Sequence, residues 1–176
     1  MHPDPNRDRL FESWIGAHGG IIVKVARSFA RNPADMEDLR QEMMLRLWMS
    51  APTFQERAKA STWIYRVCLN TALSWHRGTG RRERRIDAEA DVAKAPAGGA
   101  SPAEAASQGD MLEQLYGAIR SMPESDRALV LLMLDGLAYR EISEVTGLTE
   151  NHVGVMLTRA RGKLAERLKG LRHELE

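Results

Sequence analysis

Residues 137–168 combine polar and cationic side chains with two successive helical patterns. The first pattern, at 138–145, ends at the Thr146-Gly147 turn signal, and a longer pattern follows. Two helices joined by a short turn containing Gly make the helix-turn-helix pattern, whose second helix enters a groove of duplex DNA. On one side of that helix, amide, imidazole and cationic groups match the chemistry of base edges and phosphates. The candidate contacts there are Asn151, His152, Val155, Met156, Arg159 and Lys163.

The opposite side of the same helix is apolar. Its residues recur at helical spacing, which predicts that this side is buried against a core. They are Val153, Leu157, Ala160, Leu164 and Leu168. An ordinary amphipathic helix with a solvated basic face is the alternative, because helical hairpins are common.

A second candidate surface lies on the helix predicted from 33 to about 49. Asn32 and Pro33 predict its start, with Asn as N-cap and Pro at the first helical position. Acidic and amide side chains then line up beside its buried side at helical spacing. They are Asp38, Gln41, Glu42 and Leu45, with Arg46 alongside. Such a stripe suits docking on a basic or amphipathic helix of a partner. A solvated charged face is the alternative, and a metal site is a poorer interpretation because no His or Cys joins the carboxylates.

The helix predicted from 61 to 77 mixes aromatic and cationic residues. Aromatic rings stack on unpaired bases, and Arg holds phosphates. The side with Ile64, Cys68 and Trp75 is predicted to be core. Trp63 is a further aromatic candidate, and Tyr65, Arg66, Asn70 and Arg77 fall on another side, which continues into the run of Arg81, Arg82, Arg84 and Arg85.

The remaining sequence shows how these helices are held. Residues 88–109 are rich in Ala, Gly, Pro and Ser and cannot bury enough apolar surface to offset the entropy of ordering them. Everything else has a helical pattern without strand alternation. We therefore predict an all-α chain with a first domain at 8–86, a flexible linker at 87–109 and a second domain at 110–172 containing the helix-turn-helix. Each domain is small enough to be marginal for a helical core.

Smaller signals refine the predicted helices. The first helix, from Leu10 to Phe29, is expected to weaken at His18-Gly19-Gly20, and the helix that begins at Ser61 is expected to decay at Gly78 and Gly80. In the second domain, helices are expected at 111–122 and 124–134, with Gly136 as a C-cap.

The two halves differ in charge although the whole chain carries only +1. Residues 1–85 contain 15 Lys and Arg against 9 Asp and Glu, a balance of +6. Residues 86–176 contain 10 against 15, a balance of −5. The halves are therefore electrically different bodies.

Composition excludes several classes of protein. The one cysteine, Cys68, rules out an internal disulfide and is expected to be a small core residue instead of a nucleophile. No apolar run approaches the ~20 residues that span a bilayer, and the polar N-terminus lacks a signal-peptide core. We expect a cytoplasmic protein without membrane insertion. The five His are scattered and no catalytic motif is present, so we expect no enzyme, no cofactor and no metal site.

Taken together, the chain resembles the ECF (extracytoplasmic function) sigma factors of bacterial RNA polymerase over about residues 8–170. The family's acidic helix, which binds the clamp helices of the largest polymerase subunit, is similar to DMEDLRQEMMLRLW (Asp35 to Trp48). The helix that opens and reads the minus-ten element is similar to STWIYRVCLNTALSWHR (Ser61 to Arg77). The minus-thirty-five reader is similar to LDGLAYREISEVTGLTENHVGVMLTRARGKL (Leu134 to Leu164).

The resemblance implies a factor that joins core RNA polymerase, directs it to promoter DNA and melts the start site, usually under an anti-sigma factor. It implies polymerase contacts at Asp35, Asp38, Gln41, Glu42, Leu45 and Arg46. It implies minus-ten contacts at Trp63, Tyr65, Arg66, Asn70, Arg77, Arg81 and Arg82, with the loop at 52–60 forming part of a pocket for extruded bases. For the minus-thirty-five element it adds Arg140 and Arg161 as backbone contacts.

Two positions depart from the family pattern. Family members often carry a basic residue where this chain has Met156, and a polar or charged one where it has Gly154. These positions face or flank DNA in the family, so the bases read and the phosphates held are open questions. Gly154 also costs the helix ~1 kcal/mol against Ala, and it would allow the backbone a close approach to DNA.

Three other functions stay open on the sequence. The first is a sigma-like decoy that binds an anti-sigma protein without reading DNA, against which the Arg run and the basic helix argue. The second is a stand-alone helix-turn-helix regulator, against which the acidic stripe argues. The third is an enzyme such as a nuclease, for which no set of catalytic ligands is present.

Overall fold

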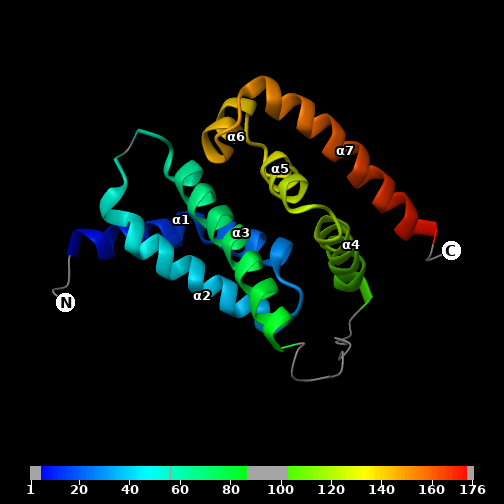
Figure 1. The fold of residues 1–176 in the computed structure, drawn as a ribbon, viewed down its shortest axis with the longest axis horizontal. Helices are drawn as coiled ribbons and strands as arrows, with labels where there is room; N and C mark the ends of the chain where they lie inside the picture. Colours follow the sequence, from blue (N-terminus) through cyan, green and yellow to red (C-terminus); the bar gives the residue numbers. More distant parts are fainter. Residues whose placement is uncertain (1–4, 56, 87–102, 174–176) are drawn as a thin grey trace.

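The computed structural model describes residues 5–55, 57–86 and 103–173, with only the backbone described at 76–86, 103–108 and 171–173. Within these ranges the elements are α1 (Pro5–Phe29), α2 (Pro33–Ser50), the 3-10 helix η1 (Ala51–Thr53), α3 (Ala60–Ile86), α4 (Ala103–Arg120), α5 (Glu124–Leu134), α6 (Tyr139–Thr146) and α7 (Glu150–His173) (Figure 1). The described ranges contain no strand, which confirms the predicted all-α class.

Helices α1, α2 and α3 pack on one another as the first bundle. The predicted start of α2 is confirmed, because the Asn32 side chain accepts a hydrogen bond from the Asp35 backbone N–H at 2.8 Å and Pro33 stands in the first turn. The N-terminal residues of α1 are held against the C-terminal end of α2. There the Arg7 guanidinium lies 3.5 Å from the centre of the Trp48 ring, and the Trp48 indole donates to Asp8 at 2.9 Å.

The weakening expected at 18–20 does not interrupt α1, which is continuous through its glycines. Apolar residues on both sides of this stretch, Trp14 and Ile21, are buried in the same core. Their packing outweighs the ~1 kcal/mol that each Gly costs a helix. Helix α3 is likewise continuous past Gly78 and Gly80 to Ile86, so the decay predicted there was also wrong.

Helix α4 begins at Ala103, inside the range predicted as linker. The sequence from Ala103 to Gln108 contains three Ala together with Glu104 and Gln108, which are strong helix formers, and it therefore extends the helix that follows. Residues 87–102 of the predicted linker lie outside the described part of the chain.

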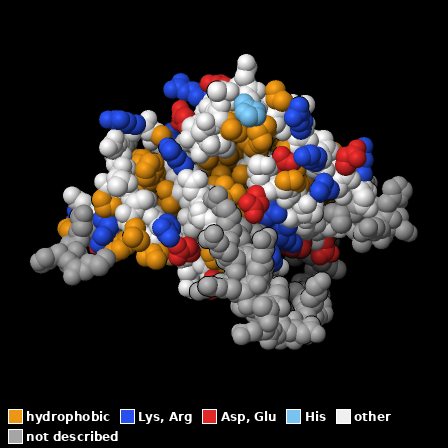
Figure 2. Space-filling view, viewed as in Figure 1, with side chains coloured by type: hydrophobic (Ala, Val, Ile, Leu, Met, Phe, Trp, Pro, Cys, Tyr) orange, Lys and Arg blue, Asp and Glu red, His pale blue; other side chains and the backbone are white. Residues whose placement is uncertain are grey.

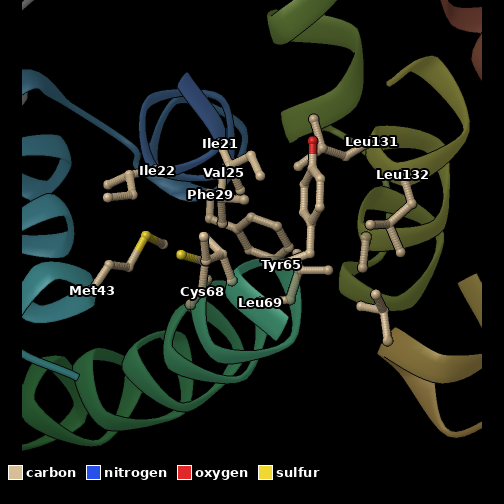
Figure 3. Packing of buried hydrophobic residues seen from close by; sticks show 14 of the residues in the cluster. Ile21, Ile22, Val25, Phe29, Met43, Tyr65, Cys68, Leu69, Leu131 and Leu132 are labelled. Carbon is tan, nitrogen blue, oxygen red and sulfur yellow. The ribbon is translucent and has the colours of Figure 1, made fainter. Parts of the chain in front are cut away.

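One apolar core runs through both halves of the chain. Figure 3 shows Tyr65 of α3 between Phe29 on one side and Leu131 and Leu132 of α5 on the other. The same cluster continues into α6 and α7, where Ile142, Val145, Val153 and Leu157 are buried. The halves therefore share a core, which supplies the apolar burial that each small domain lacks alone.

A smaller core belongs to the second half alone. It joins α4, α5 and α7 through Ala118, Ile119, Met122, Val130, Ala160 and Leu164. The stripe predicted along the last helix is thus divided between two cores: Val153 and Leu157 enter the shared one, and Ala160 and Leu164 enter the smaller one.

The predicted helix-turn-helix is present as α6, a short turn and α7. Gly147 closes α6 with φ of 75°, a conformation that Gly adopts without steric cost. The Ser143 hydroxyl donates to the Leu148 carbonyl at 2.5 Å across the turn. Thr149 then caps α7, because its hydroxyl accepts from the His152 backbone N–H at 3.3 Å.

Gly154 lies where α7 approaches α6. A Cβ atom added there would meet the Tyr139 ring at 3.4 Å, whereas one added at Gly162 of the same helix would meet nothing within 4 Å. The absence of a side chain at Gly154 therefore leaves room for the ring of Tyr139, which is half exposed.

Cys68 is fully buried, and this burial raises the pKa of its thiol to about 12. Since the thiolate is the reactive form, we expect no reaction with a disulfide reagent at pH 8 in the folded protein and stoichiometric reaction in guanidinium chloride. Spectrophotometric thiol titration measures both. Rapid reaction of the folded protein would show that the core around Cys68 opens easily.

We expect Gly162→Ala to raise the melting temperature, since Ala stabilises a helix by ~1 kcal/mol over Gly, worth roughly 2–4 °C in a chain of this size. Gly154→Ala should give an equal or smaller rise, because the half-exposed Tyr139 ring must shift slightly. Calorimetry gives both melting temperatures, and their difference isolates the effect of the contact between residue 154 and the Tyr139 ring. A fall for Gly154→Ala beside a rise for Gly162→Ala would mean that the ring cannot move.

Candidate nucleic-acid interface

The outer side of α7 is open to solvent. Asn151, His152, Arg159 and Arg161 are exposed, and Val155 is 52% exposed. Arg140 projects from α6 with an 81% exposed side chain and forms a 3.3 Å ion pair with Glu144. Polar, cationic and small apolar groups on one accessible helix face suit a groove of duplex DNA.

Two residues predicted for this face are placed differently from the others. Met156 is half-buried against the shared core and lines an apolar groove of about 220 Å³ together with Leu69 and Leu73 of α3. Lys163 pairs with Asp126 at 2.6 Å, and Asp126 is itself buried. On the face of the molecule drawn in Figure 2, which has the viewpoint of Figure 1, apolar side chains (orange) are accessible near the centre.

The aromatic residues of α3 are more enclosed than their pattern suggested. Tyr65 is only 2% exposed, because α5 and α6 of the second half cover this side of the helix. The prediction that Tyr65 lies on a side away from the core is therefore wrong for this arrangement. Trp63 is half-buried, and its ring centre lies 5.8 Å from that of Phe54, which in turn meets Trp14 edge-on at 5.3 Å.

A cavity of about 320 Å³ opens beside Trp63. It is lined by Arg57 and Ala58 of the loop before α3, by Thr62, Trp63 and Arg66, and by Glu144 of α6. An aromatic wall with two guanidinium groups suits an unpaired base and its phosphate. Asn70 is exposed farther along α3. The side chains of Arg77, Arg81 and Arg82 lie outside the described residues.

The loop contributes residues that were not named individually from the sequence. Arg57 lines the cavity, Lys59 leads into α3, and Phe54 supports Trp63. The sequence signal for these residues was the presence of two cations and one aromatic residue in a short polar loop before an aromatic helix. Their positions could not be predicted, because they depend on how the loop packs against α3.

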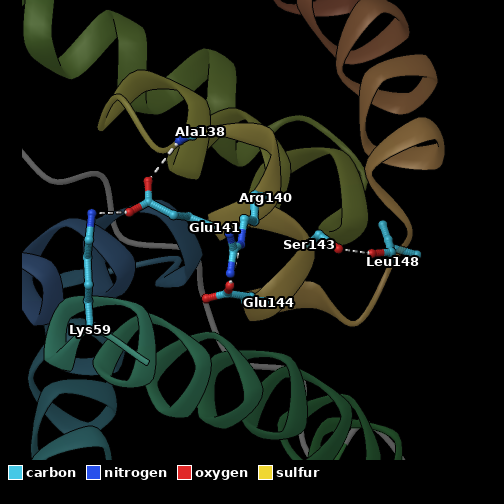
Figure 4. A network of polar contacts seen from close by, with 7 residues as sticks. All are labelled: Lys59, Ala138, Arg140, Glu141, Ser143, Glu144 and Leu148. Atoms are coloured by element: carbon cyan, nitrogen blue, oxygen red, sulfur yellow. Dashed lines mark hydrogen bonds and ion pairs between the residues drawn. The ribbon is translucent and has the colours of Figure 1, made fainter. Parts of the chain in front are cut away.

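A polar network joins the loop to the helix-turn-helix (Figure 4). Lys59 donates to Glu141 at 2.7 Å, and the second carboxylate oxygen of Glu141 accepts from the Ala138 backbone N–H at 2.9 Å. The hydrogen bond from Lys59, followed by that from Ala138, lowers the pKa of Glu141. Hydrogen bonding to Glu141 likewise raises the pKa of Lys59.

The predicted acidic stripe lies along the outer side of α2. Asp38 and Gln41 are exposed, and Leu45 is 49% exposed beside them. Asp35 pairs with Arg31 at 3.0 Å, and Arg46 pairs with Glu42 at 2.8 Å. A carboxylate-rich helix face with an exposed leucine is suited to a basic partner helix.

Other sites are not indicated within the described residues. These residues contain no group of three His, Cys, Asp or Glu side chains placed to hold a metal ion. None of their helices has the length and hydropathy needed to cross a bilayer.

Two family models match the chain in order. Sigma-70 region 2 matches residues 4–82, and Sigma-70 region 4 matches residues 112–164. The first match contains α2, the loop after it and α3 as far as residue 82, and the second contains α6, the turn and α7 as far as residue 164.

Similar proteins support the same assignment. The ECF RNA polymerase sigma factor SigE of Mycolicibacterium smegmatis is 28% identical over 165 residues, which are 93% of this chain and 62% of that protein. The ECF RNA polymerase sigma-E factor of Escherichia coli K12 is 28% identical over 144 residues, 78% of this chain and 75% of that protein. This chain thus spans less than two thirds of the first relative's length.

Two solved structures share the fold. The sigma factor RpoE in complex with the anti-sigma factor NepR from Bartonella quintana has a TM-score of 0.70 at 22% identity, over 90% of this chain and 96% of that one. CnrH in complex with the cytosolic domain of CnrY has a TM-score of 0.63 at 19% identity, over 95% and 99%. Members of this family are transcription factors and not enzymes. With regions 2 and 4 in order and ECF relatives along most of its length, the chain belongs to the ECF sigma factors.

Proposed function

We propose that the chain binds core RNA polymerase, directs it to a specific promoter and stabilises the opened start site. The observation that carries this proposal is the presence, on one chain, of the acidic α2 face, the aromatic and cationic cavity beside α3, and the exposed outer side of α7. A stand-alone DNA-binding regulator needs only the last of these.

The polymerase contact is proposed for α2. Asp35, Asp38, Gln41, Glu42, Leu45 and Arg46 form this face. Exposed carboxylates would steer the approach of a basic partner helix, and the exposed Leu45 would supply apolar area at the centre of the contact.

The minus-ten contact is proposed for the cavity formed by the loop and α3. An extruded base would stack on Trp63, while Arg57 and Arg66 would hold the adjoining phosphates. Unpairing a base costs a few kcal/mol, which this stacking would offset. Asn70 extends the same surface along α3, Tyr65 would join it only if the second half no longer covered it, and Arg77, Arg81 and Arg82 are proposed to continue it.

The minus-thirty-five contact is proposed for α7. Asn151, His152 and Val155 would meet base edges, with Arg140, Arg159 and Arg161 on the backbone. Met156 and Lys163 would join this contact after leaving their present partners, the apolar groove and Asp126.

Control by an anti-sigma factor is also proposed, because the two similar solved structures are complexes with such proteins. The working compartment would be the cytoplasm, where RNA polymerase acts. We further propose the functional division into an N-terminal domain at 8–86 and a C-terminal domain at 110–172, joined by a linker at 87–109.

Purified core polymerase with this chain is expected to initiate at specific sites on genomic fragments, and Asp38→Arg is expected to weaken core binding at least tenfold by placing a cation against the basic partner. Transcript mapping and fluorescence anisotropy measure the two effects. Glu166→Arg, at an exposed site on α7, is the matched charge control and should retain core binding. Absence of both specific transcripts and core binding with the unaltered chain would refute the proposal.

Arg159→Ala is expected to weaken promoter binding and to lower the slope of log affinity against log salt by about one, because one phosphate contact is lost. Lys163→Ala should in addition lower the melting temperature, since it leaves buried Asp126 without its ion-pair partner. Binding titrations at several salt concentrations, paired with thermal melts, separate the two residues. An unchanged slope for Arg159→Ala would remove it from the backbone contacts.

A further inference from the structure

We infer that the outer side of α7 carries an apolar strip that reads the methyl groups of thymine bases in the minus-thirty-five element. The strip consists of Val155 and the methyl group of Thr158, one helical turn apart, and the ring of Tyr139 borders it. This inference rests on the function proposed above, because it names the base chemistry that the α7 contact recognises.

Val155 places an apolar side chain among the polar and cationic groups of this side. It is 52% exposed, although Val153 and Leu157 of the same helix are buried in the shared core. A single exposed apolar residue is common on protein surfaces. Val155 differs from that case because apolar groups from two further residues lie next to it.

Thr158 adds a second methyl group to the strip. It is exposed and follows Val155 by three residues, so the two side chains are neighbours on the helix surface. The Thr158 hydroxyl donates to the Gly154 carbonyl at 2.9 Å. Because this hydrogen bond turns the hydroxyl onto the helix backbone, the methyl group is the part of the side chain left for a ligand.

The absence of a side chain at Gly154 keeps an aromatic ring accessible beside the strip. Tyr139 of α6 is 49% exposed, and a Cβ atom at residue 154 would meet its ring at 3.4 Å. A polar or charged side chain at this position, as in the family pattern, would stand against the ring and next to Val155. Gly154 therefore keeps this part of the reading side apolar.

Thymine offers the matching group in the major groove. Its methyl is apolar, whereas the base edges otherwise present hydrogen-bond donors and acceptors. Small apolar side chains such as the Thr methyl contact the thymine methyl, but against the other edges they would shield donors and acceptors from water without replacing the lost hydrogen bonds. The strip therefore favours thymine by attraction and disfavours other bases by desolvation.

The groups around the strip favour duplex DNA over an apolar protein surface as its partner. Arg159 and Arg161 are exposed on the same helix, and phosphates would neutralise them. Asn151, one turn before Val155, carries the amide that pairs with an adenine edge. An element that contains A·T pairs thus satisfies the amide, the cations and the methyl groups together.

The first experiment identifies the element and its thymines. Holoenzyme assembled from core RNA polymerase and the full chain is used to select duplexes from a pool with a randomised upstream element, and the bound duplexes should share an element containing thymine. Each thymine is then replaced by uracil, which lacks only the methyl group, and binding is measured by fluorescence anisotropy. Uracil should weaken binding about fourfold at one or two adjacent positions, as expected for one buried methyl-sized group.

The second experiment assigns those positions to residues. Val155→Ala shortens the valine, and Thr158→Ser removes the threonine methyl while keeping the hydroxyl that bonds to Gly154. Each variant should lose about fourfold in affinity for the thymine duplex and bind the uracil duplex equally well at the position that it contacts. Val23→Ala, at a 41% exposed valine of α1, is the matched control and should keep the full uracil effect.

The outcomes separate this inference from the proposed function. A shared element in which no thymine is sensitive to uracil would overturn the methyl contact while sequence-specific binding stands. A uracil effect that Val155→Ala and Thr158→Ser both leave unchanged, in variants with native helicity by circular dichroism, would overturn it equally. Absence of any shared element, together with absence of specific transcripts, would refute the proposed function and the inference with it.

Discussion

The apolar core shared by the two halves is the interaction on which the other features depend. It begins at Trp14 in α1, passes through Tyr65 in α3 and ends at Leu157 in α7. A helical domain of 60 to 80 residues buries too little surface to be more than marginally stable, and the second half has only a small core of its own. Packing on the first half therefore fixes the register of α7, because Val153 and Leu157 enter the shared core while their neighbours face outward.

Local signals in the sequence predicted the start of α2, the end of α6 and the buried side of α7. The Asn32 cap, the positive φ of Gly147 and the apolar stripe of α7 follow from steric and hydrogen-bonding rules that act within a few residues. Long-range packing decided what these rules missed. Tyr65 and Met156 each fall outside the apolar stripe of their own helix, as the periodicity indicates, but the other half covers them. The glycines of α1 were expected to weaken a helix that tertiary burial on both sides holds together.

Charged contacts between the halves complement this core. The net charge of +1 hides the difference in charge between the two halves. Arg127 of α5 shows the cost of placing a cation at the junction of the halves: burial lowers the pKa of its guanidinium. The group is held there by the carbonyls of Arg120 and Met122 and by the Phe29 ring of α1, 5.1 Å away. Glu113 of α4 pairs with Arg27 across the same contact and with Arg120 of its own helix, and the hydrogen bond from Arg27 lowers the pKa of Glu113 most. Charged groups thus specify which faces meet, while apolar burial supplies most of the attraction.

This division of roles limits how the chain can open. Separating the halves exposes the shared core, including Leu69, Leu129 and Met156 around one groove. Screening by salt weakens the exposed ion pairs but leaves that apolar cost in place. A ligand shifts such an equilibrium only by its difference in affinity for the two states. A partner that covers this apolar surface would therefore shift the equilibrium toward the separated halves.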